Sequence, residues 1–479
     1  MSFKSIFNII GRVLLLEAVI LFLPLGVCLI YGEGCAKSFV VSIIVSAALG
    51  AVMVVLTQKG RKALCVSESL ATAALTWIFA SLVGCMPFIL SGEIASFPDA
   101  FFETVSGFTT TGASILTDVE HMSRGLLFWR SLTHWLGGMG ILVLVTAIAD
   151  SGGSTNILKA EMPGHSLDKF TPKAKNNAKL LYGIYFALTL AETILLLLGG
   201  MPLFDSIVHA LGTAGTGGFG IKADSVGSYS AYLQWVIIVF MLLFGVSFNI
   251  YCLLLMRRWR KAASSNELVC YLCIFAAACA IVCINIYPLY GSFSDALRLS
   301  AFQTASIITT TGYATADFNA WPLLSKSVLL MLMFCGGCMG STAGGLKISR
   351  VTVLAQVCAN ELRRSVNPRA VSSVRLNGSV LTERQEHDVL SYLALYIVVI
   401  AATYLIVSIN GLGFEEDLTA AISCINNIGP GFGLIGPAGS YAAYSGFSKI
   451  VLSLAMLIGR LEIYPMLALM TLEDRKSVV

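Results

Sequence analysis

Long apolar runs separated by short polar breaks extend over the whole chain of 479 residues. A helix needs about 20 apolar residues to cross a bilayer, and ten runs are long enough: residues 13–30, 39–56, 69–90, 128–148, 180–198, 233–255, 269–290, 328–357, 389–410 and 447–470. Four shorter apolar segments are too brief to cross and predict re-entrant half-helices: residues 98–108, 202–213, 293–308 and 414–426. The pattern therefore predicts an all-α polytopic membrane protein.

A polar, glycine-centred motif follows each half-helix. The copies are Phe108-Thr-Thr-Thr-Gly112, Gly215-Thr-Gly-Gly-Phe219, Thr309-Thr-Thr-Gly-Tyr313 and Asn426-Asn-Ile-Gly-Pro430. With Gly112, Gly217, Gly312 and Gly429 taken as equivalents, the motif recurs about once per hundred residues, which indicates an internal repeat. Helix-breaking backbone at membrane depth is tolerated only inside protein or beside a wet cavity. The four copies therefore predict four quarters of one pore.

The repeat also predicts how the chain is divided. An N-terminal hairpin of two helices, residues 1–62, has no such motif and stands outside the repeat. Four pore repeats follow at residues 63–165, 166–262, 263–375 and 376–479.

Composition and charge support a membrane location. Hydrophobic residues make up 56% of the chain and charged residues 12%, whereas about a quarter of the residues in a soluble domain are charged. Lys and Arg collect in alternate loops, and the positive-inside rule then places both termini in the cytoplasm. The net charge of +4 follows from this topology and predicts no nucleic acid partner. The first apolar run lacks a small-residue cleavage site, so it predicts a retained anchor helix rather than a signal peptide.

The glycine motifs carry the candidate chemistry. Rings of backbone carbonyls replace the water shell of a dehydrated cation in selectivity filters, and glycine adopts the backbone conformations that such loops need. The candidate filter residues are Thr110, Thr111, Gly112, Thr216, Gly217, Thr310, Thr311, Gly312, Asn427, Ile428 and Gly429. Within this set, K⁺ is expected at Thr111, Gly112, Thr216, Gly217, Thr311, Gly312, Ile428 and Gly429. Only glycine is common to all copies, which predicts potassium preference with imperfect discrimination.

Each half-helix begins with an acidic residue: Asp99, Asp205, Asp295 and Asp417. An acid in the first turn compensates the positive end of the helix dipole, so the electronegative ends are expected to point toward the membrane centre. Simple capping at the interface and cation enrichment at the outer mouth are both compatible with this pattern.

A glycine-rich stretch interrupts the run at residues 328–357. Each glycine costs about 1 kcal/mol relative to alanine in a helix, so we expect the helix to break into a loop that obstructs the pore; a small-residue packing seam is the alternative. The candidate gate residues are Gly336, Gly337, Gly340, Ser341, Thr342, Gly344, Gly345, Lys347 and Arg460. Arg460 lies in the last apolar run, where an arginine faces a cavity or a partner. We expect it to bind loop carbonyls or to lie in the pore, unless it extends to the cytoplasmic surface.

Other classes of protein are less well supported. The five histidines are scattered, and Cys270-Tyr-Leu-Cys273 and Cys335-Gly-Gly-Cys338 lack a second ligand pair, so the cysteines are expected to be free thiols and the chain to hold no cofactor and no enzyme site. The Gly215–Gly220 segment follows a half-helix rather than a strand, which excludes a dinucleotide fingerprint. A proton- or sodium-coupled symporter remains an alternative, with Glu17, Glu192 and Glu462 as its candidate carboxylates.

These motifs together resemble the Trk, Ktr and HKT potassium transporter superfamily, and most closely its bacterial Trk members. The resemblance is carried by Phe108-Thr-Thr-Thr-Gly112, Trp129-Arg130, Trp135-Leu-Gly-Gly-Met-Gly140, Gly217-Gly-Phe219, Thr310-Thr-Gly312, the loop from Gly336 to Lys347, Gly429-Pro-Gly431 and Gly459-Arg-Leu-Glu462. It implies four repeats of an outer helix (M1), a pore half-helix (P) and an inner helix (M2). It also implies one key filter glycine per repeat and a gate made by the third M2 loop with an arginine of the fourth M2.

The resemblance further implies potassium uptake, and possible passage of Rb⁺, in the bacterial inner membrane. It implies a homodimer with one pore per protomer, controlled by a cytosolic nucleotide-binding regulator of the TrkA type. Relatives that pass sodium can carry serine at the first filter glycine, so Gly112 indicates potassium. The additional Gly215 departs from the family pattern and is expected to loosen the second quarter of the filter.

Overall fold

The computed structural model describes residues 3–58, 64–140, 143, 174–369 and 373–470. Within them the chain is helical apart from one antiparallel pair of two-residue strands, β1 (Arg375–Leu376) and β2 (Ser379–Val380). The expected boundaries near residues 62 and 165 fall outside the described residues, so the predicted division into domains stays a prediction.

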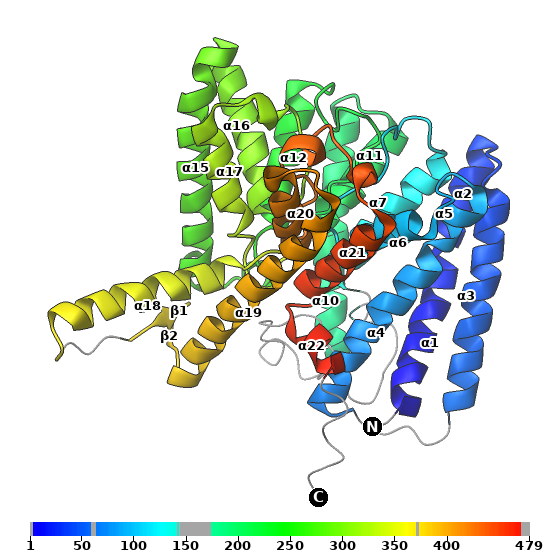
Figure 1. The fold of residues 1–479 in the computed structure, drawn as a ribbon, viewed down its shortest axis with the longest axis horizontal. Helices are drawn as coiled ribbons and strands as arrows, with labels where there is room; N and C mark the ends of the chain where they lie inside the picture. The colour runs from blue at the N-terminus through cyan, green and yellow to red at the C-terminus, as the bar shows by residue number, and fades with distance from the viewer. Residues whose placement is uncertain (1–2, 59–63, 141–142, 144–173, 370–372, 471–479) are drawn as a thin grey trace, which may run out of the picture.

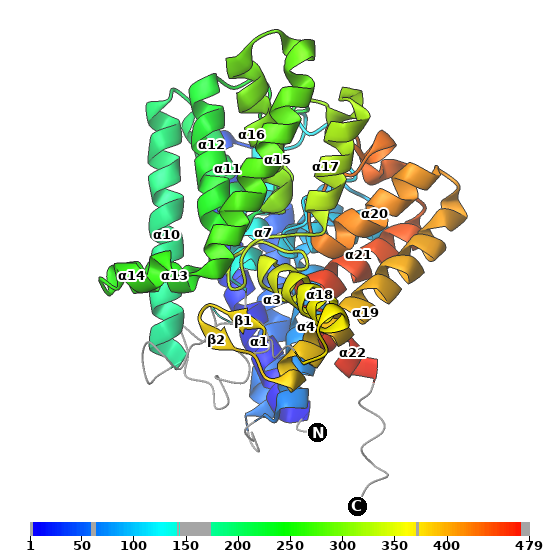
Figure 2. The same cartoon turned by 90° about the vertical axis from the view of Figure 1, so that its left-hand side faces the viewer.

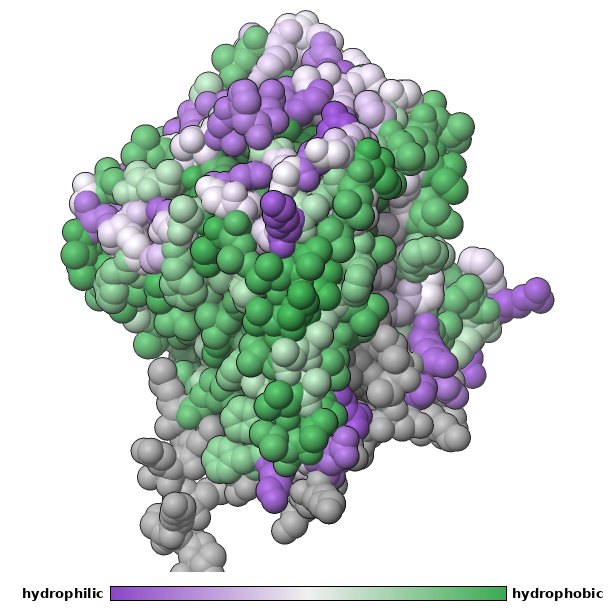
Figure 3. Space-filling view, turned by 90° about the vertical axis from the view of Figure 1, so that its right-hand side faces the viewer, coloured by the Kyte–Doolittle hydropathy of each residue, from purple (hydrophilic) through white to green (hydrophobic). Residues whose placement is uncertain are grey.

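The N-terminal hairpin stands at one edge of the molecule (Figure 1). It consists of α1 (Phe3–Ile20), α2 (Phe22–Tyr31) and α3 (Ala36–Thr57). Gly11 and Gly50 let α1 and α3 pack backbone to backbone, because a Cβ atom on either glycine would lie within 3 Å of the other residue's carbonyl oxygen. The outward face is apolar, with Ile44, Val52 and Leu56 exposed, and Figure 3 shows a broad hydrophobic band between two more hydrophilic ends.

The rest of the chain repeats one pattern of a long outer helix, a short helix and an interrupted inner helix. The first copy contains α4 (Val66–Gly84), α5 (Met86–Ser91), α6 (Phe97–Phe108) and α7 (Arg124–Met139); the second contains α10 (Ala174–Leu198), α11 (Leu203–Gly215), α12 (Ala231–Phe244), α13 (Phe248–Leu255) and α14 (Trp259–Ala263). The third contains α15 (Asn266–Tyr290), α16 (Phe293–Ile308), η2 (Phe318–Ala320), α17 (Leu323–Met333) and α18 (Ile348–Val366). The fourth contains α19 (Glu383–Val407), η3 (Ser408–Asn410), α20 (Phe414–Asn426), η4 (Gly433–Ile435), η5 (Tyr441–Ala443), α21 (Gly446–Arg460) and α22 (Tyr464–Met470). The short helices α6, α11, α16 and α20 confirm the predicted half-helices.

The outer helices and the hairpin make the continuous membrane crossings. Among the described residues, six helical segments are long and apolar enough to span: Phe3–Tyr31, Ala36–Thr57, Val66–Ser91, Lys175–Leu198, Asn266–Tyr290 and Glu383–Asn410. They correspond to six of the ten predicted spans. The other four predictions all fall on inner helices.

The inner helices are interrupted where the sequence predicted continuity. The prediction of one helix over residues 233–255 is wrong, because α12 and α13 meet at an angle of 88°, and Figure 2 shows α13 leaving the bundle almost at right angles to α12. The prediction for residues 447–470 is also wrong, because α21 ends at Arg460 and Glu462 and Ile463 take positive φ. The break predicted within residues 328–357 is confirmed. In the first copy α7 ends at Met139, and most of the predicted helix beyond Gly140 lies outside the described residues.

The acidic residues that begin the short helices are engaged with neighbours. Asp99 pairs with Lys449 at 2.6 Å, and Asp295 pairs with Arg298 at 2.7 Å. Asp205 accepts from Tyr229 at 2.8 Å, and Asp417 accepts from Tyr444 at 3.1 Å; the latter pair ties a half-helix to the loop before α21. These contacts favour a capping and packing role for the four acids.

Candidate functional site

The same turn ends each of the four short helices in the described chain. One residue takes the left-handed conformation, with φ between 54° and 56°: Thr110, Thr216, Thr310 and Asn427. The N–H of the next residue then donates to a carbonyl five residues earlier: Thr111 to Ser106 at 2.9 Å, Gly217 to Gly212 at 2.9 Å, Thr311 to Ser306 at 2.8 Å and Ile428 to Ser423 at 3.0 Å. This pattern is a Schellman cap, and it turns the chain away from the helix axis.

A glycine with positive φ stands two residues after each left-handed residue. These are Gly112 (78°), Gly218 (79°), Gly312 (84°) and Gly429 (102°). The predicted register of the second copy is therefore wrong by one residue, because Gly218 and not Gly217 is the geometric equivalent of Gly112. An L-residue with a side chain would be strained at these angles.

The four turns close into a ring in chain order. A Cβ atom on Gly112 would lie 1.9 Å from the Gly217 carbonyl oxygen, and one on Gly218 would lie 2.0 Å from that of Thr311. A Cβ atom on Gly312 would lie 2.1 Å from the Ile428 carbonyl oxygen, and one on Gly429 would lie 2.6 Å from the Thr111 carbonyl oxygen, which closes the ring. Each glycine thus contacts the carbonyl of the neighbouring copy, and no side chain fits between them. We call this set of four turns the glycine ring.

His134 on α7 joins the first two turns. Its Nδ1 lies 2.8 Å from the Gly107 carbonyl oxygen, so Nδ1 carries the proton, and its Nε2 accepts from the Phe219 N–H at 3.3 Å. A Cβ atom on Gly217 would lie 2.2 Å from the imidazole, and one on Gly215 would lie 2.3 Å from the His134 carbonyl oxygen. Both extra glycines of the second copy therefore provide close contact with α7, and Gly215 does not leave a gap. No spacing in the sequence could have singled out His134.

A buried ion pair supports the chain after the first turn. Arg130 and Glu103 lie 2.7 Å apart, and the two side chains are 2% and 0% exposed. Glu103 also accepts from the Ile115 N–H at 3.0 Å, and the Arg130 guanidinium lies 4.0 Å from the centre of the Phe219 ring. Burying charges is costly unless they are paired, so this pair fixes the loop beside the ring. Sequence patterns marked Arg130 only as part of a motif and did not mark Glu103.

Asn427 replaces threonine in the fourth turn. Its Nδ2 donates to Thr111 Oγ1 at 3.0 Å and to the Met456 carbonyl oxygen at 3.0 Å. Asparagine tolerates the left-handed conformation better than most residues, and its amide ties the fourth turn to the first and to α21.

The four ring glycines line one pocket, which we call the outer pocket. Gly112, Gly218, Gly312 and Gly429 all line this outer pocket, together with Arg130 and Lys222. The four aspartates that begin the short helices are not among its lining residues. The structure therefore lends no support to cation enrichment by these acids at the mouth.

A loop between α17 and α18 crosses the other side of the ring. Its Gly344 N–H donates to Thr310 Oγ1 at 2.7 Å, and a Cβ atom on Gly344 would lie 2.5 Å from the Asn426 carbonyl oxygen. The loop is also tied to the bend between α12 and α13, because the Cys338 N–H donates to Gly245 and the Phe248 N–H donates to Gly340, both at 2.9 Å. This loop, residues 334–347, contacts the glycine ring directly, and we call it the inner loop.

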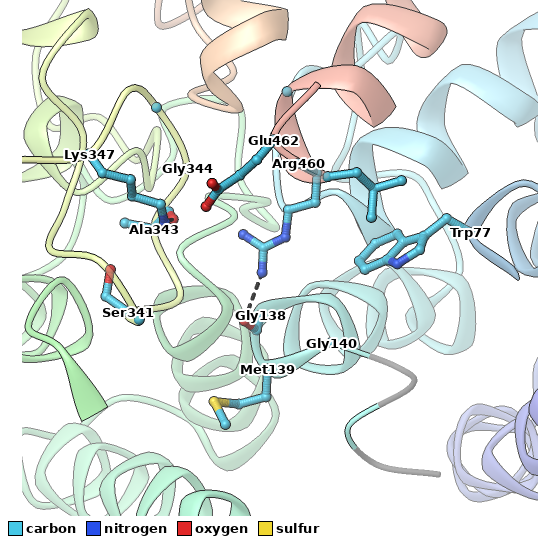
Figure 4. Close-up of a pocket in the computed structure, with 14 residues that line it drawn as sticks. Trp77, Gly138, Met139, Gly140, Ser341, Ala343, Gly344, Lys347, Arg460 and Glu462 are labelled. Carbon is cyan, nitrogen blue, oxygen red and sulfur yellow. Dashed lines mark hydrogen bonds between the residues drawn. The ribbon is translucent and has the colours of Figure 1, made fainter. Parts of the chain in front are cut away.

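Arg460 bridges the inner loop and the first copy. Its guanidinium donates to the carbonyl oxygens of Thr342, Gly137 and Gly138, each at 2.7 Å. Figure 4 shows the side chain extending from the end of α21 between the inner loop and α7. The hydrogen bond to a loop carbonyl agrees with the sequence-based expectation.

A second pocket lies beneath the ring around Arg460. Of the candidate gate residues, Gly340, Ser341, Gly344, Gly345, Lys347 and Arg460 line it; Trp77, Met139 and Glu462 were not predicted. Gly336 and Gly337 instead allow the loop to fold on itself. A Cβ atom on Gly336 would lie 2.5 Å from the Gly344 carbonyl oxygen, and one on Gly337 would lie 2.6 Å from the Ala343 Cβ. The Lys347 ammonium donates to the Ala343 carbonyl oxygen.

A partly buried ion pair holds the end of the inner loop against the break at residues 461–463. Arg350, in the first turn of α18, pairs with Glu462, and its guanidinium lies 3.9 Å from the centre of the Tyr392 ring. Glu462 has positive φ, so this pair stabilises a strained break in the chain. The pairing connects the third and fourth copies.

The geometry defines a multi-pass membrane protein in which one chain closes four similar turns around an axis, with a pocket on either side. Comparison with known proteins then gives the family. The TrkH family model, described as a cation transport protein, matches residues 36–268 and 290–478. The chain belongs to this family.

Individual relatives match over nearly the full length. The Trk system potassium uptake protein TrkH of Salmonella typhimurium is 34% identical over 98% of this chain and 99% of that protein. Its counterpart in Escherichia coli is 33% identical over the same shares. The crystal structure of the potassium transporter TrkH from Vibrio parahaemolyticus superimposes with a TM-score of 0.89 at 31% identity and covers 100% of both chains.

Proposed function

We propose that this protein takes up potassium ions through the glycine ring. The observation that carries the proposal is the ring itself, in which four Schellman turns bring the carbonyl groups of consecutive copies together with no side chain between them. The names of the similar proteins, which are potassium uptake proteins and a potassium transporter, support the same ion.

In this proposal a potassium ion enters from the outer pocket and exchanges water for backbone carbonyl oxygens. The turns would supply these oxygens from residues 110–112, 216–218, 310–312 and 427–429. Carbonyl dipoles coordinate the ion without a full negative charge, so that binding is firm enough to admit the ion and weak enough to release it. Rb⁺, which is close to K⁺ in size, would pass as well.

We propose that the inner loop and Arg460 together form the gate. The loop carries a hydrogen bond to the ring through Thr310, and the Arg460 guanidinium places a positive charge on the path beneath it. A cation leaving the ring would meet this charge, and like charges at close range in a poorly hydrated site repel strongly. Movement of the loop would release Arg460 from Thr342 and clear the path.

Control would come from a cytosolic nucleotide-binding regulator of the TrkA type acting on a homodimer. α18 continues directly from the inner loop, and it projects away from the rest of the bundle (Figure 1). Leu362 and Val366 are 70% and 87% exposed on this helix, beside Arg363 and Arg364. A regulator bound there would act on the loop through α18.

The test is flux in proteoliposomes at a controlled membrane potential, combined with growth rescue of a potassium-transport-deficient bacterium. Radioactive rubidium or potassium should accumulate along the electrical gradient, and excess sodium should compete weakly. Equal competition by sodium would contradict the proposed filter. Failure to rescue growth on low potassium, with the protein present in the membrane, would contradict potassium uptake.

A proton-coupled potassium symporter is the second candidate. Glu17 and Glu192 lie in membrane-spanning segments and are buried, 4% and 0% exposed. A carboxyl group inside a membrane-spanning helix is a candidate proton carrier. Symport predicts that a pH gradient alone drives potassium uptake and that Glu17→Gln or Glu192→Gln abolishes this coupling, whereas a channel needs only the electrical gradient.

A further inference from the structure

Two buried thiols and a carboxylate meet at the turn of the N-terminal hairpin. Cys28 lies on α2, Cys35 precedes α3, and Glu33 lies in the turn between them. Their three ligand atoms are all within 4.8 Å of one another, and Cys35 Sγ lies 3.6 Å from Glu33 Oε2. The cysteines are 0% and 6% exposed. The turn itself creates this cluster, since Gly32 takes φ 68° and the Glu33 N–H donates to the Cys28 carbonyl at 2.9 Å.

The beginning of α7 closes the cluster from the opposite side. Glu33 Oε1 accepts from the Arg124 N–H at 2.7 Å, and Oε2 accepts from the Gly125 N–H at 3.0 Å. A Cβ atom on Gly125 would lie 2.0 Å from Cys28 Sγ and 3.3 Å from Cys35 Sγ. The cluster therefore lies between the hairpin and α7, with both sulfurs buried and Glu33 partly exposed.

The donor set suits a soft divalent cation. Sulfur and carboxylate ligands bind Zn²⁺ in tetrahedral geometry with Zn–S distances of about 2.3 Å. In a tetrahedral zinc site with these bond lengths, two sulfur ligands lie about 3.8 Å apart. The two sulfurs of this cluster lie within 4.8 Å of each other, which is compatible with that spacing. Each Glu33 oxygen keeps a further lone pair after accepting its N–H, so the carboxylate can cap α7 and bind a cation together. Hydrogen bonds that orient a metal ligand in this way are usual around zinc.

We propose that Cys28, Glu33 and Cys35 form a site for a soft divalent cation of the zinc type, which fastens the hairpin to the start of α7. Binding would release the thiol protons, and water would complete the fourth coordination position. The site is separate from ion conduction, since none of its three ligands lines the pocket on either side of the glycine ring. Its place is at the α2–α3 turn, at the end of the hairpin away from the chain termini (Figure 1).

The test uses the full-length protein, purified with a reductant and without chelators. Zinc alone is the probe, and elemental analysis after desalting should find one equivalent per chain. Cobalt in place of zinc should give a sulfur-to-metal charge-transfer band. Cys28→Ser and Cys35→Ser should each weaken that band by about half, and the double variant should lose it. Cys283→Ser, which changes another buried cysteine on α15, should keep both the zinc and the band.

Glu33→Gln separates coordination from folding. The amide oxygen can still accept a backbone N–H, so the variant should fold, but it should bind zinc at least tenfold more weakly. In the unaltered protein, zinc should protect Cys28 and Cys35 from a thiol reagent, as located by mass spectrometry, while the exposed Cys65, Cys273 and Cys358 react at unchanged rates.

Full zinc binding by the double cysteine variant would overturn the proposal. Two results on the unaltered protein would also overturn it: no zinc-dependent protection of Cys28 and Cys35, or a Cys28–Cys35 disulfide that persists in the reduced preparation.

Discussion

The glycine ring and the layer beneath it, which contains the inner loop (residues 334–347), Arg460 and the breaks in the inner helices, are built on opposite principles. In the ring, four copies repeat one turn, with a left-handed residue at the same position, the same hydrogen bond to a carbonyl five residues earlier and a glycine at the same position. Beneath it, three inner helices are interrupted in three different ways: by the 88° bend after α12, through the inner loop, and at residues 461–463. An ion on the axis requires similar ligands from all sides, whereas a gate needs only one movable segment.

The largest effect is expected from a change in the ring at its corrected register. Gly218→Ala places a Cβ atom 2.0 Å from the Thr311 carbonyl oxygen at a backbone angle that costs about 1–2 kcal/mol for a residue with a side chain. Rubidium flux should fall by at least about tenfold, since 1.4 kcal/mol is already tenfold in a rate. Flux into proteoliposomes, normalised to the amount of folded protein, measures it.

Gly220→Ala is the matched control for that change. The nearest atom to a Cβ on Gly220 is 3.4 Å away, and its φ is not positive. This variant should conduct at nearly the native rate. If Gly218→Ala conducts as well as Gly220→Ala, the ring does not require glycine at the position that the structure gives.

The second largest effect is expected from changes in the layer beneath the ring, which should raise flux rather than lower it. Deletion of Gly340–Gly345 should raise flux several-fold in the absence of the regulator, because the segment in contact with Thr310 is gone. Arg460→Ala should raise it less, because one positive charge and its three carbonyl contacts are lost while the loop remains.

Arg460→Lys is the control for the charge. Lysine keeps the positive charge but cannot form the same planar set of hydrogen bonds. Flux through the Arg460→Lys variant should therefore lie between that of the native protein and that of Arg460→Ala. Flux that stays fully regulator-dependent in the deletion variant would rule out the inner loop as the gate, and unchanged flux in Arg460→Ala would restrict the arginine to a structural role.

A smaller effect is expected where the two regions touch. Thr310→Val keeps the shape of the side chain but removes the hydroxyl that accepts the Gly344 N–H at 2.7 Å. A hydrogen bond of this kind contributes about 1 kcal/mol, so the closed loop should be weakened and basal flux should rise a few-fold. Thr310→Ser keeps the acceptor and should behave like the native protein. Equal flux in the two variants would show that this bond does not hold the loop closed.

The smallest effect is expected at the edge of the fourth copy. Lys449 pairs with Asp99 at 2.6 Å, which joins α21 to the start of α6, and the Asp99 side chain is 26% exposed. A partly exposed pair contributes about 1 kcal/mol or less, so Lys449→Gln should lower the melting temperature slightly and leave the potassium to sodium flux ratio unchanged. A changed ratio would mean that this pair shapes the ring.

The sequence predicted the half-helices well because their boundaries are local signals. Each begins beside a proline or an acid and ends at a glycine motif, and both signals act within a few residues. It failed at Gly217 because the second copy has three glycines within four positions, and only backbone geometry shows that Gly218 takes the positive φ. Gly215 and Gly217 are explained by the close approach of His134, which lies more than 80 positions earlier in the chain, and composition does not reveal such a contact.

The breaks in the inner helices could not be predicted for a different reason. The apolar run continues through Gly245 without interruption, and the bend there is stabilised by hydrogen bonds from the inner loop, which belongs to the next copy. At Glu462 the partner is Arg350, 112 positions earlier. Local patterns found the break in the third inner helix because there the glycines themselves are dense. The other breaks depend on tertiary contacts.

The most direct test of the central claim is the potassium to sodium flux ratio of Gly112→Ser, measured beside Arg460→Ala in the same proteoliposomes. If the ring chooses the ion and the layer beneath decides whether it passes, the serine variant should have a lower ratio, whereas the arginine variant should have more flux at the native ratio. A native ratio in folded, conducting Gly112→Ser would contradict the account.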